Sequence, residues 1–187
     1  MKKTNIILFL LFILTLVGVG AFYLGYYGYE KKLTSVDIKN EFNKSMPLEV
    51  GTMAGTFRLN GIEQIEIHAD KKAYFELSYV LTTINDYPYK GNFYFEADIL
   101  DNFKEGNIRI RNVELLRTSI DDSKKPLSEG IHKMIDDSIQ RYIIDRRFQY
   151  AQIFDFHENW KRKAMFHFLQ EMSIKDDHVY LKFGLDY

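Results

Sequence analysis

The sequence contains few side chains whose types and spacing could carry out a reaction. Its five histidines are too widely separated to form the H-E-x-x-H or H-x-x-H pairs that bind zinc from one helix face. They are His68, His132, His157, His167 and His178. The chain has no cysteine, which excludes a thiolate metal site, a disulfide and a cysteine nucleophile. We therefore predict no metal, no cofactor and no catalytic residue.

Three acidic doublets, Asp121-Asp122, Asp136-Asp137 and Asp176-Asp177, could supply acid–base groups if they entered a cleft. Their neighbours predict a turn, a polar helix face and a hairpin turn, so we interpret all three as solvated surface. The sequence also lacks a G-x-S-x-G elbow, a Walker phosphate loop and a glycine fingerprint after a strand. These features favour a protein that is not an enzyme.

Composition restricts the class of partner. The chain has 187 residues, with 25 Lys and Arg against 26 Asp and Glu, and a formal net charge of −1. This balance argues against a nucleic-acid partner, which requires a basic surface. A hydrophobic share of 46% is ordinary for a globular chain, and the length fits one domain with an appendage.

The appendage is an apolar run without a charge, 19 residues from Ile6 to Leu24. Lys2 and Lys3 precede it, and several tyrosines follow it where an interfacial aromatic belt would lie. A helix of this length reaches roughly the ~30 Å thickness of the hydrocarbon core of a bilayer. We predict a single-pass membrane anchor over residues 1–29 and one further domain over residues 30–187.

A cleaved signal peptide is the alternative for residues 1–29. Its apolar region is usually shorter, about 7–15 residues, and ends in a small-x-small site. Gly18-Val19-Gly20 or Val19-Gly20-Ala21 could serve as that site, but the apolar run continues beyond both. Lys2 and Lys3 favour a cytoplasmic N-terminus, although Lys31 and Lys32 nearly cancel the asymmetry.

Hydrophobic periodicity predicts the elements of the domain. Apolar residues at helical spacing follow a capping-box pattern at Thr34 to Asp37, and apolar alternation with period two then predicts strands. The expected helices cover residues 34–47, 127–143 and 158–172, and the expected strands cover residues 53–68, 75–82, 89–99 and 108–115. Residues 150–156 are an aromatic strand or extended link, and residues 174–183 are a hairpin or terminal strand.

Each predicted strand has one apolar and one polar face, which is typical of an antiparallel sheet with one face buried. In the fourth strand the apolar parity changes beyond Asn112, and a β-bulge there would restore it. The order of elements predicts an α+β domain in which helices cover the apolar face of an antiparallel sheet.

The order of these elements resembles the YceB-like bacterial envelope lipoproteins of the tubular lipid-binding (TULIP) superfamily. The likeness covers residues 33–184. It is carried by Leu33 to Ile38 opening a helix, the strand pair Phe93 to Ile99 and Ile108 to Leu115, the helix through Ile139 to Tyr142, Phe148-Gln149-Tyr150, and the closing hairpin from Lys175 to Phe183.

The resemblance implies a strongly curved antiparallel sheet wrapped around a long helix, with an elongated apolar groove that takes an acyl chain. It also implies a place in the bacterial envelope. The chain departs from the family because it has no cysteine to be acylated. Anchoring would instead depend on Ile6 to Leu24, in the inner (cytoplasmic) membrane with the domain facing the periplasm.

We therefore expect a non-enzymatic protein that binds or transfers a lipid, with a membrane and an unidentified envelope protein as further partners. Each buried CH₂ of an acyl chain would contribute ~0.8 kcal/mol. The expected groove residues are Phe57, Leu59, Phe75, Leu77, Tyr79, Phe93, Phe95, Ile131, Ile135 and Ile139. The alternative is a membrane-tethered interaction or assembly module, in which the same side chains form a filled core without a ligand.

Overall fold

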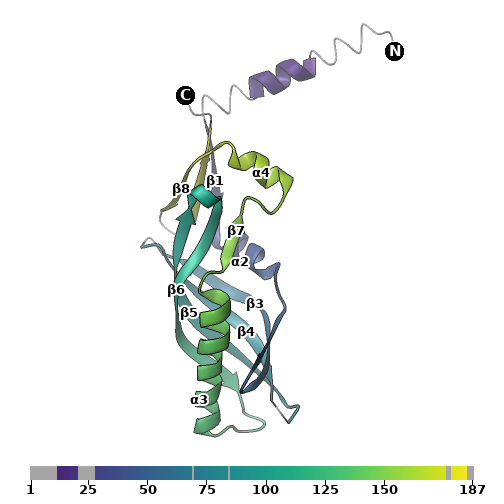
Figure 1. The fold of residues 1–187 in the computed structure, drawn as a ribbon, viewed down its shortest axis with the longest axis vertical. Coiled ribbons are helices and arrows are strands. Elements are labelled where there is room, and N and C mark those ends of the chain that lie inside the picture. The colour runs from purple at the N-terminus through teal and green to yellow at the C-terminus, as the bar shows by residue number, and fades with distance from the viewer. Residues whose placement is uncertain (1–11, 21–27, 69, 84, 176–177, 185–187) are drawn as a thin grey trace, which may run out of the picture.

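The computed structural model describes residues 12–20, 28–68, 70–83, 85–175 and 178–184. Its main body is a strongly curled antiparallel half-barrel of six strands in the order β2-β3-β4-β5-β6-β7 (Figure 1). The strands are β2 (Leu48–Thr52), β3 (Gly55–Ile67), β4 (Lys72–Thr82), β5 (Pro88–Asn102), β6 (Asn107–Asp121) and β7 (Gln152–Asp155). The fold class is α+β, as predicted.

One long helix packs against the apolar face of this sheet. Its first part is α3 (Glu129–Ser138), and it continues without a break as the π-helical segment η2 (Ile139–Phe148). Ile135, Ile139 and Ile143 are buried on its sheet-facing side. The predicted helix is therefore confirmed, although it extends to Phe148 and its second half has the wider π-helical hydrogen-bonding pattern.

A smaller sheet closes one end of the half-barrel. It has the order β1-β9-β8 and consists of β1 (Tyr29–Leu33), β9 (His178–Phe183) and β8 (Leu169–Lys175). All pairs are antiparallel, and Tyr29 lies opposite Phe183. Helix α4 (Trp160–Phe166) lies at this end, and α2 (Ser35–Asn43) lies farther along, beside β3 and β7 (Figure 1). The 3-10 turn η1 (Phe103–Glu105) joins β5 to β6.

Several local predictions are confirmed. The capping box at α2 is present, because the Asp37 N–H donates to the Thr34 hydroxyl and the Asp37 carboxylate accepts from the Thr34 N–H at 2.9 Å. The predicted strand pair of Phe93 to Ile99 with Ile108 to Leu115 forms as β5 and β6. Of the two alternatives for residues 174–183, the hairpin is the one that forms, from β8 and β9. Asn112 has a left-handed φ of 50° at a register shift between β5 and β6, which is the predicted bulge.

The long strand β3 bends where α2 docks on it. Gly61 has a φ of 153°, and a Cβ there would lie 2.9 Å from the Asn43 side-chain oxygen. The Asn43 amide accepts from the Ile62 N–H at 2.7 Å and donates to the Ile62 carbonyl at 3.1 Å. The Asn43 side chain therefore provides hydrogen-bond partners for the Ile62 backbone, in place of those that the register shift removes from the sheet.

The predicted helix over residues 158–172 is wrong beyond Phe166. Residues from Leu169 onward form β8, because their backbone pairs with β9. Trp160 and Phe168, two large apolar residues of the predicted helix, are exposed. The short strands β1 and β2 were not predicted. Met53, at which the first predicted strand begins, is exposed in the turn between β2 and β3.

Only part of the predicted anchor is described. Residues 12–20 are helical, and their large apolar side chains from Phe12 to Val19 are exposed. Residues 6–11 and 21–24 of the predicted span lie outside the described residues. Among the residues described, no helix combines the length and apolar character needed to cross a membrane. The anchor stays a prediction.

The capping box gives a pH-dependent test of local stability. Hydrogen bonds from the backbone and hydroxyl of Thr34 lower the pKa of Asp37 below its ordinary 3.8. Their stabilising effect is therefore present above pH 3.8 and is lost as the pH falls through the folded-state pKa. We expect Thr34→Ala to lower the free energy of unfolding by about 1 kcal/mol at neutral pH, as measured by urea unfolding.

The same measurement below the folded-state pKa of Asp37 should show a smaller difference between the variant and the wild type. Thr34→Ser keeps the hydroxyl and serves as the control, with near wild-type stability at both pH values. An equal loss of stability at neutral and acidic pH would contradict the assigned role of Asp37.

Candidate functional site

The structure brings the predicted groove residues together between the half-barrel and the long helix. The strand members from Phe57 to Phe95 are buried at 0 to 2% exposure, and so are Ile135 and Ile139 on the helix. Ile131 is partly buried against the same core. The sequence therefore identified one continuous apolar cluster, formed by three strands and one helix.

Phe148, at the end of η2, lies at the centre of this cluster. Its ring centroid is 5.4 Å from that of Phe95, 5.4 Å from that of Phe42 and 6.4 Å from that of Phe93. Phe75 and Phe95 stack nearly parallel, with ring centroids 4.7 Å apart. The expected groove list omitted Phe42 and Phe148, although Phe42 belongs to the helical stripe of α2.

These contacts fill the space in which an acyl chain was expected. Nine of the residues expected to line the groove are only 0 to 2% exposed, so other atoms of the protein cover their side chains almost completely. Burial also raises the pKa of Tyr79, whose hydroxyl donates to the Ser119 carbonyl at 3.2 Å. In this conformation the expected groove residues form a packed core.

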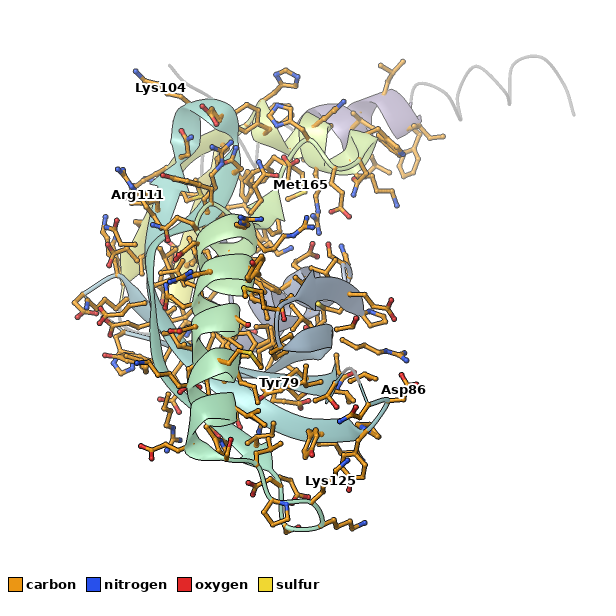
Figure 2. The ribbon with its side chains drawn as sticks, turned by 60° about the horizontal axis from the view of Figure 1, so that its bottom comes forward. Tyr79, Asp86, Lys104, Arg111, Lys125 and Met165 are labelled. Atoms are coloured by element: carbon orange, nitrogen blue, oxygen red, sulfur yellow. The ribbon has the colours of Figure 1, made fainter. Side chains whose placement is uncertain are left out.

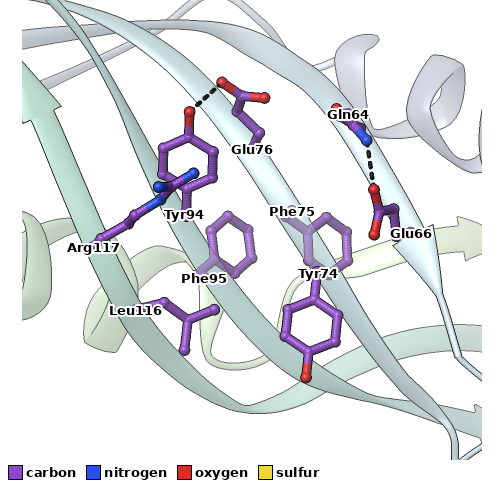
Figure 3. Close-up of a pocket in the computed structure, with 9 residues that line it drawn as sticks. All are labelled: Gln64, Glu66, Tyr74, Phe75, Glu76, Tyr94, Phe95, Leu116 and Arg117. Atoms are coloured by element: carbon purple, nitrogen blue, oxygen red, sulfur yellow. Dashed lines mark hydrogen bonds between the residues drawn. The ribbon is translucent and has the colours of Figure 1, made fainter.

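A hollow of about 450 Å³ lies on the outer face of the half-barrel (Figure 3). Its size falls within the range of small-ligand sites. Strands β3 to β6 supply its lining, in which two cross-strand rows of outward side chains lie side by side. The lining residues are Gln64, Glu66, Tyr74, Phe75, Glu76, Tyr94, Phe95, Leu116 and Arg117.

Hydrogen bonds and ring contacts hold one wall of the outer-face hollow in place. The Tyr94 hydroxyl donates to Glu76 at 2.7 Å, and the Asn92 amide donates to the same carboxylate oxygen at 2.7 Å. The Arg117 guanidinium lies 3.9 Å from the Tyr94 ring centroid (Figure 3), a cation–π arrangement. Leu116 is exposed beside Arg117 because a register shift in β6 turns it outward.

Of the two cross-strand rows, one runs across the sheet as Glu66, Tyr74, Glu96 and Glu114 and consists mostly of carboxylates. The Lys72 ammonium donates to Glu96 at 2.8 Å, and this bond, with a further one from Tyr74, lowers the pKa of Glu96. The neighbouring Glu96 carboxylate in turn raises the pKa of Tyr74. Glu96 is thus ionised and paired, whereas Glu66 and Glu114 add negative charge to the exposed surface.

The lining of the outer-face hollow combines aromatic rings with carboxylates. Its aromatic faces beside carboxylates offer cation–π and charge-assisted contacts to a positively charged group. No cluster of three or more His, Cys, Asp or Glu within the described part of the chain could hold a metal ion. The sequence signal for this site is the position of Tyr74 and Tyr94, two large aromatic residues on the strand faces that the apolar alternation predicts to be polar.

Asp122, His132 and Asp136 make local contacts at the protein surface. Asp122 accepts from the Leu127 N–H at 3.1 Å and lies 3.2 Å from the His132 Nε2, and both contacts lower its pKa, the Leu127 bond more strongly. Asp136 accepts from the Thr118 hydroxyl and ties α3 to β6. The doublet at 176–177 lies outside the described residues.

A smaller hollow of about 260 Å³ lies at the open side of the half-barrel, between the β2–β3 turn and the long helix. Met53 lines it from the turn, and Met134 and Tyr142 line it from the helix. This is the side on which β2 ends the sheet without a further strand partner among the described residues.

Comparison with known proteins adds no family to this description: no protein-family model matches the chain, and neither does any curated protein. The likeness to the YceB-like proteins therefore remains a resemblance.

The central position of Phe148 predicts a large stability effect. Phe148→Ala removes the ring that contacts both the sheet and α2, and we expect the free energy of unfolding to fall by about 3–5 kcal/mol. Urea unfolding followed by circular dichroism measures this change. Tyr150→Ala, at an exposed aromatic two residues away, is the control and should alter stability by no more than about 0.5 kcal/mol.

A loss of less than about 1 kcal/mol for Phe148→Ala would contradict a filled interior, because truncation of a side chain that lines an open groove leaves no new cavity.

Proposed function

We propose that this chain is a membrane-tethered interaction module and not an enzyme, and that the outer-face hollow receives its partner. The observation that carries the proposal is the packing of the expected groove residues against one another at 0 to 2% exposure. A core packed in this way supplies stability and shape but no internal ligand site. Binding must then use the surface.

The outer-face hollow favours a partner segment that carries arginine or lysine. The lining contains two glutamates, Glu66 and Glu76, against one arginine, Arg117. Glu114 adds a further carboxylate at the end of one cross-strand row, whereas Glu96 is paired with Lys72. A guanidinium or ammonium group above Tyr74 could contact the ring and the Glu66 carboxylate together. The proposed partner is an envelope protein, because residues 6–24 would hold the domain at the inner membrane, facing the periplasm.

The first test is whether the protein contains lipid. We expect native mass spectrometry of the full chain, released from a mild detergent, to give the mass of the polypeptide alone. The matched sample is the same protein incubated with an excess of fatty acid before analysis. A lipid retained at one molecule per chain in either sample would overturn the filled-core proposal.

The second test concerns the outer-face hollow. A photo-reactive phenylalanine analogue in place of Tyr74 should form a covalent adduct with a partner in native membranes, and the same analogue in place of Lys125, at the far loop, should not. Glu66→Lys and Glu76→Lys together reverse the charge of the hollow and should abolish the adduct at position 74. An adduct that persists in the charge-reversed chain would exclude the hollow as the docking site.

A lipid carrier is the second candidate, and the half-barrel shape with its open side favours it. The long helix lies over a curled sheet, and the smaller hollow at Met53, Met134 and Tyr142 lies where the helix could move away from β2. An acyl chain entering there would have to displace Phe148 from its ring contacts. Retained lipid in the mass measurement would support this candidate over the interaction module.

A further inference from the structure

We propose that the end of the domain at which β1 begins is a docking face for the surface of the lipid bilayer. The membrane-facing end, as we call it, comprises Tyr29 of β1, η1, α4 and Phe168. The inference deepens the proposed function and rests on its membrane tether, because it assigns the domain a fixed position on the bilayer surface. The chemistry it requires is a set of exposed aromatic side chains among lysines.

Large aromatic side chains are exposed at this end. Trp160 is 74% exposed, Phe168 and Tyr29 are each 49% exposed, and Phe103 is 40% exposed. Trp160 is the only tryptophan in the chain. Exposure of single apolar residues is ordinary, but a group of aromatic rings at one end of a domain marks an interaction surface.

A series of ring contacts connects β1, β9 and α4 at this end of the molecule. Tyr29 stacks on Phe183 at 6.1 Å, Phe183 contacts Phe156 at 6.3 Å, and Phe156 contacts Phe166 of α4 at 5.8 Å. The Phe156 N–H donates to the Gly106 carbonyl at 2.9 Å, which connects the turn after η1 to the same cluster. Figure 2 shows Lys104 and Met165 at this end, and Asp86 and Lys125 at the opposite end.

Helix α4 has two different sides. Arg162 points inward, where it donates to Glu41 at 2.5 Å and to Glu158, and Met165 and Phe166 are partly buried against the core. The opposite side exposes Trp160, Lys163, Ala164 and His167, at the spacing of one helix face. Ion pairs thus fix the inner side of α4, and its outer side carries an aromatic ring and a cation.

The charge of this face fits an anionic lipid surface. The seven residues of α4 include three basic side chains and no acidic one. Arg162 is neutralised by its ion pairs, which leaves Lys161 and Lys163 exposed to solvent. Lys161 lies 5.9 Å from the Trp160 ring. Lys104 is exposed in η1 beside Glu105, whose carboxylate is paired with Arg109 at 2.7 Å. Lysines beside tryptophan are the side chains that anchor proteins at lipid headgroups.

Chain length favours the bilayer over a protein partner as the occupant. If the span ends at Leu24, five residue steps separate it from Tyr29. An extended chain covers at most about 3.6 Å per residue, so this connection is at most about 18 Å long. The start of β1 therefore cannot lie far from the headgroups, whatever the path of the chain. Trp160, Phe103 and Phe168 lie on the end that this short connection holds toward the membrane.

The single tryptophan provides the experiment. The full chain is reconstituted into vesicles of phosphatidylcholine and phosphatidylglycerol, with and without brominated acyl chains. We expect Trp160 emission to shift to shorter wavelength on reconstitution and to be quenched by the brominated lipid. The control variant, W160F/K125W, carries its tryptophan at the opposite end and should show neither the shift nor the quenching.

Charge reversal tests the role of the lysines. K161E/K163E, with Trp160 retained, should lose most of the quenching in vesicles that contain phosphatidylglycerol. In vesicles of phosphatidylcholine alone, the wild type should already be quenched less, because the anionic headgroups are absent.

Co-flotation of the protein with the vesicles in high salt reports separately whether the tether is inserted in the bilayer. A chain that floats while Trp160 stays unquenched would overturn the docking face and leave the tether intact. A chain that does not float would overturn the tether, and with it the proposed location. Equal quenching of the wild type and of W160F/K125W would also overturn the docking face, because it would show no preferred end.

Discussion

The packing of one long helix against a curled sheet is the interaction on which the rest of the structure depends. A sheet of six strands with one apolar face must cover that face, and α3 with η2 does so through Ile135, Ile139 and Ile143. Phe148 completes the cover by filling the centre of the aromatic cluster. Without this contact the apolar face would lie open to water, and the half-barrel would have no core.

The filled interior determines where binding can occur. Because the core leaves no room for a guest in this conformation, the proposed recognition uses two separate surfaces. The outer-face hollow is acidic and aromatic, with Tyr94 held by Glu76 and Arg117. The membrane-facing end is aromatic and basic, with Trp160 beside Lys161. Opposite charges at the two surfaces suit the proposed module, which would lie on an anionic membrane and receive a cationic partner segment.

Both surfaces depend on local irregularities of the sheet. The register shift in β6 turns Leu116 and Arg117 to the same outer face, where a regular strand would alternate them. Gly61 and Asn43 bend β3 and dock α2 on it, and Glu41 of α2 then holds Arg162 of α4. A bend in one long strand is in this way connected to the orientation of the helix that presents Trp160.

Local patterns in the sequence determined the α+β class, the capping box at Thr34, the strands β4 and β5 and the bulge at Asn112, since these follow from the spacing of apolar residues along one segment. They also identified the apolar cluster, but the spacing of apolar residues is the same whether they line a groove or form a core. Only the tertiary structure decided that Phe148 fills the centre of this cluster. The end of α4 at Phe166 and the strand from Leu169 were likewise decided by pairing with β9, because backbone hydrogen bonds to a distant strand outweigh a local helical pattern.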